Sequence, residues 1–182
     1  MPDLQQNHFE LLSLPVQFAI DLDTLDLQYR RLQSDVHPDR FASAPSAERL
    51  HSMQLATQAN EAYRTLKNPT ARARYLLHIN GVDTQEESNT AMPAEFLMLQ
   101  MEWRELIEDA VAERDIAGLE KLLIKIRHEA TSLQQHLHTA IDGDEQQNKQ
   151  LALAAETVRK LSFIDKVRGD IDQAIDQIYS QT

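Results

Sequence analysis

Apolar side chains recur at helical spacing along most of this chain, and the residues that interrupt helices are scarce. The 182 residues include only four Gly and six Pro. A fold of short strands needs turn residues every few positions, so their scarcity favours long helices. Within residues 25–36, Leu25, Tyr29, Leu32 and Val36 are spaced four, three and four apart and form a single helical stripe. The sequence therefore predicts an all-α protein.

Shorter helices are expected before residue 80. Asn7 is placed to cap a brief first helix that Pro15 ends, and Asp21–Thr24 offers acidic caps for a second helix that ends before Pro38. A third helix should precede a shorter fourth helix over about 71–79. The expected apolar face of the third helix comprises Leu50, Met53, Ala56 or Thr57, Asn60, Tyr63 and Leu66.

Three longer amphipathic patterns follow Pro93, which suits the first turn of a helix. Short polar turns separate them, so they predict an antiparallel three-helix bundle. The polar stretch before Pro93 reads as a linker. We therefore expect an N-terminal helical domain at 1–79, a linker at 80–92 and a bundle at 93–182. The expected stripe of the first bundle helix comprises Leu97, Met101, Trp103 or Arg104, Leu106 or Ile107, Ala110 and Val111.

Charge is distributed unevenly along the chain, whose net charge is -11. Residues 1–75 hold 8 basic and 9 acidic side chains, whereas residues 76–182 hold 10 and 20. This balance argues against nucleic-acid binding, because phosphate contacts need clustered Lys and Arg. No apolar run reaches the length of a membrane span, and the first residues lack the features of a signal peptide, so we expect a cytoplasmic protein. The absence of Cys excludes disulfides and iron–sulfur ligation by this chain.

Other chemistries find little support. His136 and His138 are two residues apart and face different sides of a predicted helix, and His128 is too distant to complete a metal site. No Gly-rich phosphate loop occurs. His37 is conceivable as a general base, but no nucleophile or oxyanion donor accompanies it. We expect no metal, no cofactor, no catalytic residue and no enzymatic activity.

The most informative motif is the tripeptide His37-Pro38-Asp39, which lies between a predicted helix and a loop. Proline disfavours helical backbone in the residue before it, so the side chains of His37 and Asp39 should project from the end of the helix. Exposed polar groups on an anchored loop suit recognition, although turn chemistry alone also explains all three residue types. Basic side chains lie beside the tripeptide: Arg30, Arg31 and Arg40.

The first 79 residues resemble a J domain, the helical module of the DnaJ co-chaperones. The pattern Tyr-x-x-Leu-x4-His-Pro-Asp-Arg at 29–40 is followed by Asn-x-Ala-Tyr-x-x-Leu at 60–66 and Pro-x-x-Arg-x-x-Tyr at 69–75. The resemblance implies that the tripeptide engages a DnaK-type ATPase and triggers its hydrolysis of ATP. The residues that it implicates in chaperone binding are His37, Pro38, Asp39, Arg30, Arg31 and Arg40.

Nearly the whole chain is similar to the HscB family, the J-proteins of bacterial iron–sulfur cluster assembly. The stretches that carry this likeness are Glu-Phe-Leu-Met-Leu-Gln-Met-Glu-Trp-Arg-Glu-Leu at 95–106 and Val-Arg-Lys-Leu-Ser-Phe-Ile-Asp-Lys at 158–166. The family implies an L-shaped protein that binds the scaffold IscU, delivers it to the DnaK-type ATPase HscA, and stimulates ATP hydrolysis and cluster transfer. The alternatives are a general J-domain co-chaperone of DnaK with a different client, and a structural helical protein.

The same resemblance implies a scaffold-binding face on the bundle. From spacing alone, Leu97 and Met101 share a helix face, and an apolar face of this kind more often belongs to the core. However, residues 96–99 are apolar all round, and no core face of a three-helix bundle is that wide, so some of them should be exposed. The implied scaffold-binding residues are Leu97, Met98, Met101, Glu102, Glu105 and Phe163.

Overall fold

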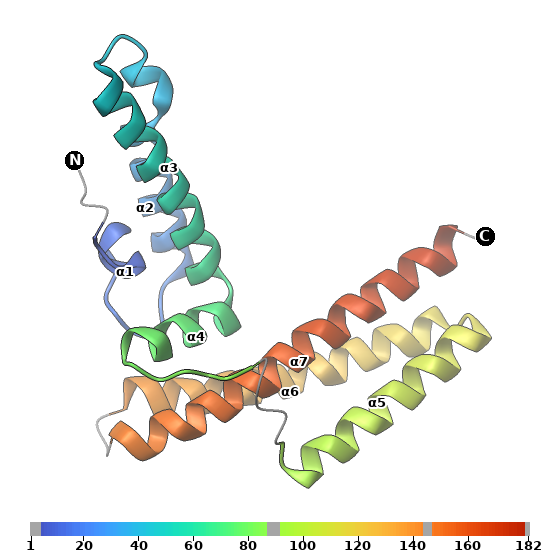
Figure 1. Ribbon diagram of the computed structural model, residues 1–182. Coiled ribbons are helices and arrows are strands. Elements are labelled where there is room, and N and C mark those ends of the chain that lie inside the picture. Colours follow the sequence, from blue (N-terminus) through green and yellow to red (C-terminus); the bar gives the residue numbers. More distant parts are fainter. Residues whose placement is uncertain (1–4, 87–91, 144–146, 181–182) are drawn as a thin grey trace. The chain divides into compact units, whose positions relative to one another are not determined.

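The computed structural model describes residues 5–86, 92–143 and 147–180 (Figure 1). Helices and turns make up these residues, and no β-strand occurs among them, so the expected all-α fold is confirmed. The chain divides into two compact units, residues 1–80 and 81–182. None of the described helices is both long and apolar enough to cross a membrane.

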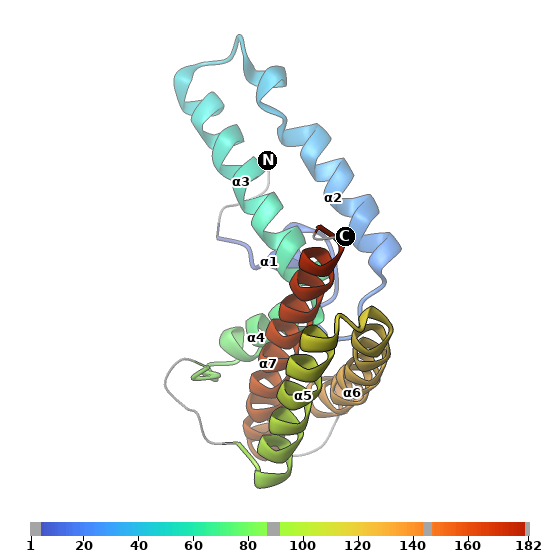
Figure 2. The same cartoon turned by 90° about the vertical axis from the view of Figure 1, so that its right-hand side faces the viewer.

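The first unit contains four α-helices and one 3-10 turn among its described residues: α1 (His8–Leu11), α2 (Leu22–Val36), η1 (Pro38–Phe41), α3 (Ser46–Lys67) and α4 (Pro69–Ile79). Figure 1 and Figure 2 both show α2 and α3 side by side. The predicted caps are confirmed, since Asn7 forms a capping box with Glu10 and the side chain of Asp21 accepts from the backbone of Asp23.

The buried face of α3 differs from the predicted one. Leu50 and Met53 are 58% and 57% exposed, whereas Leu66 is buried as expected. Apolar residues lie on more than one side of this helix, so spacing alone does not choose between them. The buried side holds small residues, which let the axes of neighbouring helices approach closely. The buried face comprises Ser52, Leu55, Ala59, Ala62 and Leu66.

A network of aromatic and polar side chains joins α2 to α3. The rings of Tyr29 and Tyr63 stack with their centroids 4.0 Å apart. The Tyr29 hydroxyl donates to Asn60 Oδ1 at 2.7 Å, and the Tyr63 hydroxyl donates to Asp26 Oδ1 at 2.9 Å. The hydrogen bond from the Tyr63 hydroxyl lowers the pKa of Asp26, and a hydrogen bond from the nearby Lys67 ammonium lowers it further by a smaller amount. Tyr29 and Tyr63 therefore hold the two helices together.

Contacts of Arg72 and Tyr75 fix α4 and α1 on this hairpin. Arg72, which is buried, donates from Nη1 to the carbonyl of Leu66 at 2.6 Å, near the end of α3. Its guanidinium lies over the Phe18 ring, 5.0 Å from the centroid. The His8 ring stacks on Tyr75 at 4.2 Å, and burial lowers the pKa of His8. Arg72 and Tyr75, both part of the J-domain pattern, therefore stabilise the unit.

The second unit contains α5 (Ala94–Glu113), α6 (Ile116–Asp142) and α7 (Gln147–Ser180). Each of these helices packs against the other two, as the predicted bundle requires. Asp115 caps α6 by accepting the backbone N–H of Gly118 at 2.9 Å. Helical spacing predicts a buried stripe on each of the two longer helices, and it is confirmed on α6 at Leu119, Leu122, Leu123, Ile126, Leu133 and Leu137, and on α7 at Leu151, Ala154, Ala155, Val158, Leu161, Ile164, Val167, Ile171 and Ile178. Three further positions of these predicted stripes, Ile141, Ala174 and Ile175, are half-buried.

The predicted stripe of α5 is confirmed at Trp103 and Ala110 but is wrong at most of its other positions. Phe96, Trp103 and Ala110 are the buried residues, spaced two helical turns apart, and the two aromatic rings meet edge to face at 6.4 Å. Aromatic side chains bury more apolar area than Leu or Met, so they take the inward positions. The predicted residues Leu97, Met101, Leu106 and Val111 are exposed instead.

The described part of the expected linker at 80–92 packs against α7. Thr84 is buried, and its carbonyl accepts a hydrogen bond from Arg159 Nη1 at 3.1 Å. The carboxylate of Glu86 accepts from the Ser162 hydroxyl. Residues 82–86 are therefore held by the second unit, and residues 87–91 of the expected linker lie outside the described residues.

Candidate functional site

The tripeptide forms an exposed turn directly after α2. Helix α2 ends at Val36, and His37 leaves the helical region with φ -59° and ψ 127°, as a residue before proline should. The backbone N–H of Asp39 donates to Nδ1 of His37 at 3.3 Å, which in the neutral ring leaves the proton on Nε2. The side chains of His37 and Asp39 are 57% and 91% exposed. Both polar groups are thus available to a partner.

This turn is anchored from two directions. Arg40 folds back onto the end of α2, where Nη1 donates to the carbonyl of Ser34 at 3.0 Å and lies 3.2 Å from Asp35 Oδ1. On the other side, the hydroxyl of the fully buried Ser52 donates to the carbonyl of Val36 at 2.7 Å. Sequence reasoning missed Ser52, because a serine within a helix carries no signal of its long-range partner.

The predicted basic residues of α2 are exposed, and acidic residues lie among them. Arg30 and Arg31 both face solvent, and Arg30 Nε donates to the carbonyl of Asp26, one turn earlier. The apolar side chain of Leu27, 44% exposed, adds to the same helix. Because residues 1–75 carry 9 acidic and 8 basic groups, the positive potential here is local and modest.

A second candidate site lies at the N-terminal end of α5. Leu97, Met98 and Met101, named here the α5 patch, are 43%, 66% and 64% exposed. They lie within four residues on a helix, so Leu97 and Met101 share one face and Met98 lies beside them. Glu102 and Glu105 are exposed next to the patch. An apolar group with a charged rim has the composition of a protein-binding surface.

The sixth predicted residue of this site, Phe163 on α7, is half-buried. The rings of Phe163 and Phe96 meet edge to face, with their centroids 6.0 Å apart. The ammonium of Lys160 lies over the Phe96 ring, with Nζ 5.8 Å from its centroid. Phe96 itself is buried. The structure therefore connects Phe163 to α5 through Phe96, a residue that the sequence prediction did not assign to the site.

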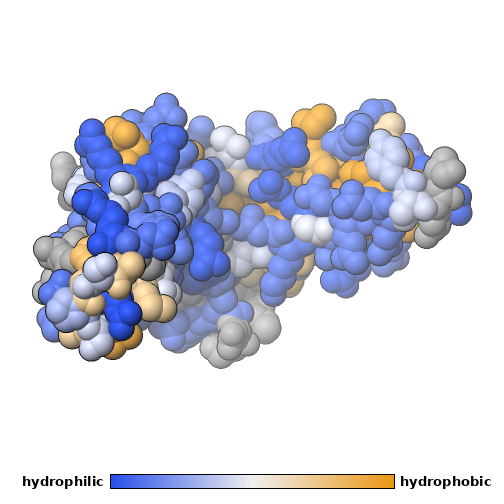
Figure 3. Space-filling model, turned by 90° about the horizontal axis from the view of Figure 1, so that it is seen from above, coloured by the Kyte–Doolittle hydropathy of each residue, from blue (hydrophilic) through white to orange (hydrophobic). Residues whose placement is uncertain are grey.

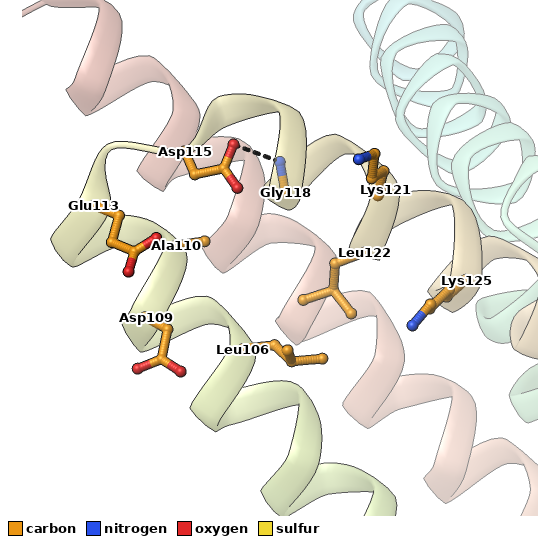
Figure 4. A pocket seen from close by; sticks show the side chains of 9 residues that line it. All are labelled: Leu106, Asp109, Ala110, Glu113, Asp115, Gly118, Lys121, Leu122 and Lys125. Atoms are coloured by element: carbon orange, nitrogen blue, oxygen red, sulfur yellow. Dashed lines mark hydrogen bonds between the residues drawn. The ribbon is translucent and has the colours of Figure 1, made fainter.

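A separate cleft of about 250 Å³ lies between α5 and α6, and Figure 4 shows Leu106 and Leu122 directed into it. Acidic residues of α5 and basic residues of α6 surround these two leucines. None of the predicted site residues lines it. The lining comprises Leu106, Asp109, Ala110, Glu113, Asp115, Gly118, Lys121, Leu122 and Lys125.

Hydrophilic residues cover most of the face seen in Figure 3, with apolar residues showing in smaller groups between them. Within the described residues, no group of three or more His, Asp or Glu side chains is placed to hold a metal ion. His138 instead has its Nδ1 2.9 Å from Oδ2 of Asp142, one turn later on α6. The two exposed surfaces described above hold most of the residues that the sequence predicted to bind partners.

Known proteins of one family match this chain over nearly its whole length. A family model described as the HSCB C-terminal oligomerisation domain matches residues 92–172. Proteins described as "Co-chaperone protein HscB homolog" from Burkholderia thailandensis and Burkholderia multivorans are each 48% identical over 178 residues. These alignments cover 98% of this chain and 99% of each relative.

Solved structures agree with these relatives. The chaperone HscB from Vibrio cholerae has a TM-score of 0.81 and 36% identity, with 95% of this chain and 99% of that chain covered. The human co-chaperone protein HscB has a TM-score of 0.84 and 25% identity, with 94% and 83% covered. Sequence identity, coverage and fold thus point to the same family. The chain belongs to the HscB family of co-chaperones.

Proposed function

We propose that this chain is a cytoplasmic, non-enzymatic co-chaperone that binds the iron–sulfur scaffold IscU and delivers it to the DnaK-type ATPase HscA, whose ATP hydrolysis it stimulates. The observation that carries the proposal is the presence of two exposed recognition surfaces on two compact units. One is the anchored turn of His37 and Asp39, and the other is the α5 patch. Membership of the HscB family supports both assignments.

The turn after α2 is suited to docking on the ATPase. His37 and Asp39 present a ring nitrogen and a carboxylate to solvent, while the bonds of Ser52 and Arg40 hold the backbone beneath them. A preorganised loop loses little conformational freedom on binding, so little of the interaction energy of its contacts is offset by an entropic cost. Arg30 and Arg31 would steer and orient the approach of an acidic partner, with a modest share of the affinity.

The α5 patch is suited to binding the scaffold. Full burial of an exposed Leu or Met side chain contributes about 1.5–3 kcal/mol. Leu97, Met98 and Met101 are 43%, 66% and 64% exposed, so covering them gives part of that energy at each residue and makes them the apolar anchors of the complex. Glu102 and Glu105 at the rim would set the register of the partner through charge complementarity. Phe163 would support the surface from α7 through its contact with Phe96.

Carrying both sites on one chain explains how the protein could act without chemistry of its own. A scaffold held by the bundle is present at the ATPase at a high effective concentration when the J domain docks. Scaffold and J domain would then stimulate hydrolysis together. The resulting change of state in the ATPase would loosen the cluster carried by the scaffold for transfer.

The substitution His37→Gln tests the first surface. It keeps a polar side chain but removes the imidazole, so we expect stimulation of HscA to be lost while IscU binding is unchanged. His128→Gln, at an exposed position on α6, is the matched control and should stimulate normally. Undiminished stimulation by His37→Gln would contradict the assignment. Stimulation of ordinary DnaK without stimulation of HscA would instead favour a general J-domain co-chaperone.

Combined substitution of Leu97, Met101 and Phe163 by Ala tests the second surface. We expect the affinity for IscU to fall by at least 100-fold, because apolar anchors carry most of the energy at such surfaces. The control is Ile124→Ala, which removes a 64% exposed apolar side chain from the same unit on α6. Trp103 fluorescence verifies that the bundle remains folded. Unchanged affinity in the triple variant would remove the proposed surface.

A further inference from the structure

The α5 patch contains two largely exposed methionines. Met98 and Met101 are 66% and 64% exposed, more than Leu97 at 43%. They are three residues apart on α5, so they are neighbours on the helix surface. The chain contains five Met and no Cys, so thioethers are its only sulfur groups. Trp103, the other readily oxidised side chain of this helix, is 3% exposed.

Exposed thioethers react with hydroperoxides. The peroxide O–O bond breaks and one oxygen forms an S–O bond, so that the sulfur loses two electrons; the other oxygen is released as water from hydrogen peroxide or as an alcohol from an organic hydroperoxide. The product, methionine sulfoxide, is polar where the thioether was apolar. A partner that covers the patch must then desolvate a strong hydrogen-bond acceptor without replacing its water contacts, which is unfavourable.

We propose that Met98 and Met101 form an oxidation site through which hydroperoxides control the scaffold-binding surface. The inference rests on the proposed function, since it takes the α5 patch as the surface that IscU covers. Conversion of both thioethers to sulfoxides lowers the affinity for the scaffold. Reduction by a thiol-dependent methionine sulfoxide reductase, which releases the oxygen as water, restores it.

The position of the two residues also predicts that the partner protects them. In the free chain both methionine residues are largely exposed, whereas a scaffold seated on the patch would exclude peroxide from them. Met53 provides an internal reference, because it is 57% exposed but lies on α3 in the other unit. Bound IscU should therefore slow oxidation at Met98 and Met101 and leave the rate at Met53 unchanged.

The test treats the full chain with hydrogen peroxide, identifies the oxidised residues by peptide mass mapping, and measures IscU affinity before and after. We expect Met98 and Met101 to be oxidised and the affinity to fall at least tenfold, with recovery after treatment with the reductase. In the variant M98L/M101L, whatever its starting affinity, peroxide should cause no further change. The variant M53L should respond to peroxide as the wild type does.

Each result decides one question. Complete oxidation of Met98 and Met101 with unchanged affinity would overturn the inference and leave the proposed function intact. Slower oxidation of these residues than of the half-buried Met92 would also overturn it. Failure of the untreated wild type to bind IscU would instead refute the proposed function, and the inference would fall with it.

Discussion

The hydroxyl of Ser52 joins α3 to the end of α2, directly before the His37 turn, so its removal tests how firmly that turn is anchored. Ser52 is fully buried, and its Oγ donates to the carbonyl of Val36 at 2.7 Å. The substitution Ser52→Ala deletes this donor and leaves the buried carbonyl without it. The perturbation is small in volume, because only one oxygen atom is removed.

The expected cost follows from two opposing effects. Leaving a buried acceptor unsatisfied costs about 1–3 kcal/mol. Alanine has a higher helix propensity than serine, and this offsets the loss of stability by about 0.5 kcal/mol. The net loss of unfolding free energy for the first unit is therefore about 0.5–2.5 kcal/mol. With a urea m-value of about 1 kcal/mol/M for a unit of this size, the midpoint should fall by roughly 0.5–2.5 M.

Urea unfolding of the full chain measures this loss. Far-UV circular dichroism follows both units, and the fluorescence of Trp103, the only tryptophan, follows the second unit alone. The matched control is Thr57→Ala, which removes an exposed hydroxyl that bonds to the carbonyl of Met53 on the same helix. We expect no loss in the control and no shift of the Trp103 transition in either variant. A midpoint for Ser52→Ala equal to that of Thr57→Ala would refute the reasoning.

Other substitutions test the remaining structural claims. The Tyr63 hydroxyl lowers the pKa of Asp26 below its ordinary 3.8, so the stability that Asp26 contributes is complete above that pH and is lost as pH falls through its folded pKa. Asp26→Asn should therefore destabilise the first unit more at pH 7 than at pH 3. If the substitution lowers the urea midpoint by the same amount at both pH values, the reasoning is contradicted. Gly169→Ala should stabilise the bundle by about 0.5–1 kcal/mol, because its Cβ meets nothing within 4 Å in the interior of α7; a lower thermal midpoint would contradict it. Phe96→Ala should cost the bundle about 3–5 kcal/mol in urea unfolding, and a loss below 1 kcal/mol would exclude Phe96 as a core residue.

Local signals placed the ends of the helices well. Asn7 and Asp21 cap α1 and α2 as expected, and α2 ends one residue before His37-Pro38. Caps and prolines act within a few residues of themselves, so their effect is visible without a partner helix. The tripeptide and the residues around it were recognisable for the same reason, because the pattern is contiguous in the chain.

The inward faces of α3 and α5 were not predictable in this way. Each helix has more than one apolar stripe, and spacing alone assigned the core to Leu50 and Met53 on α3 and to Leu97 and Met101 on α5. Each of these residues is exposed in the structure. The stripes of α6 and α7 were predicted correctly, because each of these helices has one dominant apolar face.

The sequence by itself determined the all-α class, the approximate extent of the helices, and the family resemblance, since these depend on periodicity, caps and contiguous motifs. Tertiary structure alone decided which stripe of α3 and α5 is buried, how Ser52 and Arg40 anchor the His37 turn, and that Phe96 links Phe163 to α5. The physical reason is that burial is a property of a pair of surfaces. A stripe of apolar residues becomes core only when another helix covers it, and the stripe left uncovered, as on α5, remains available to a partner.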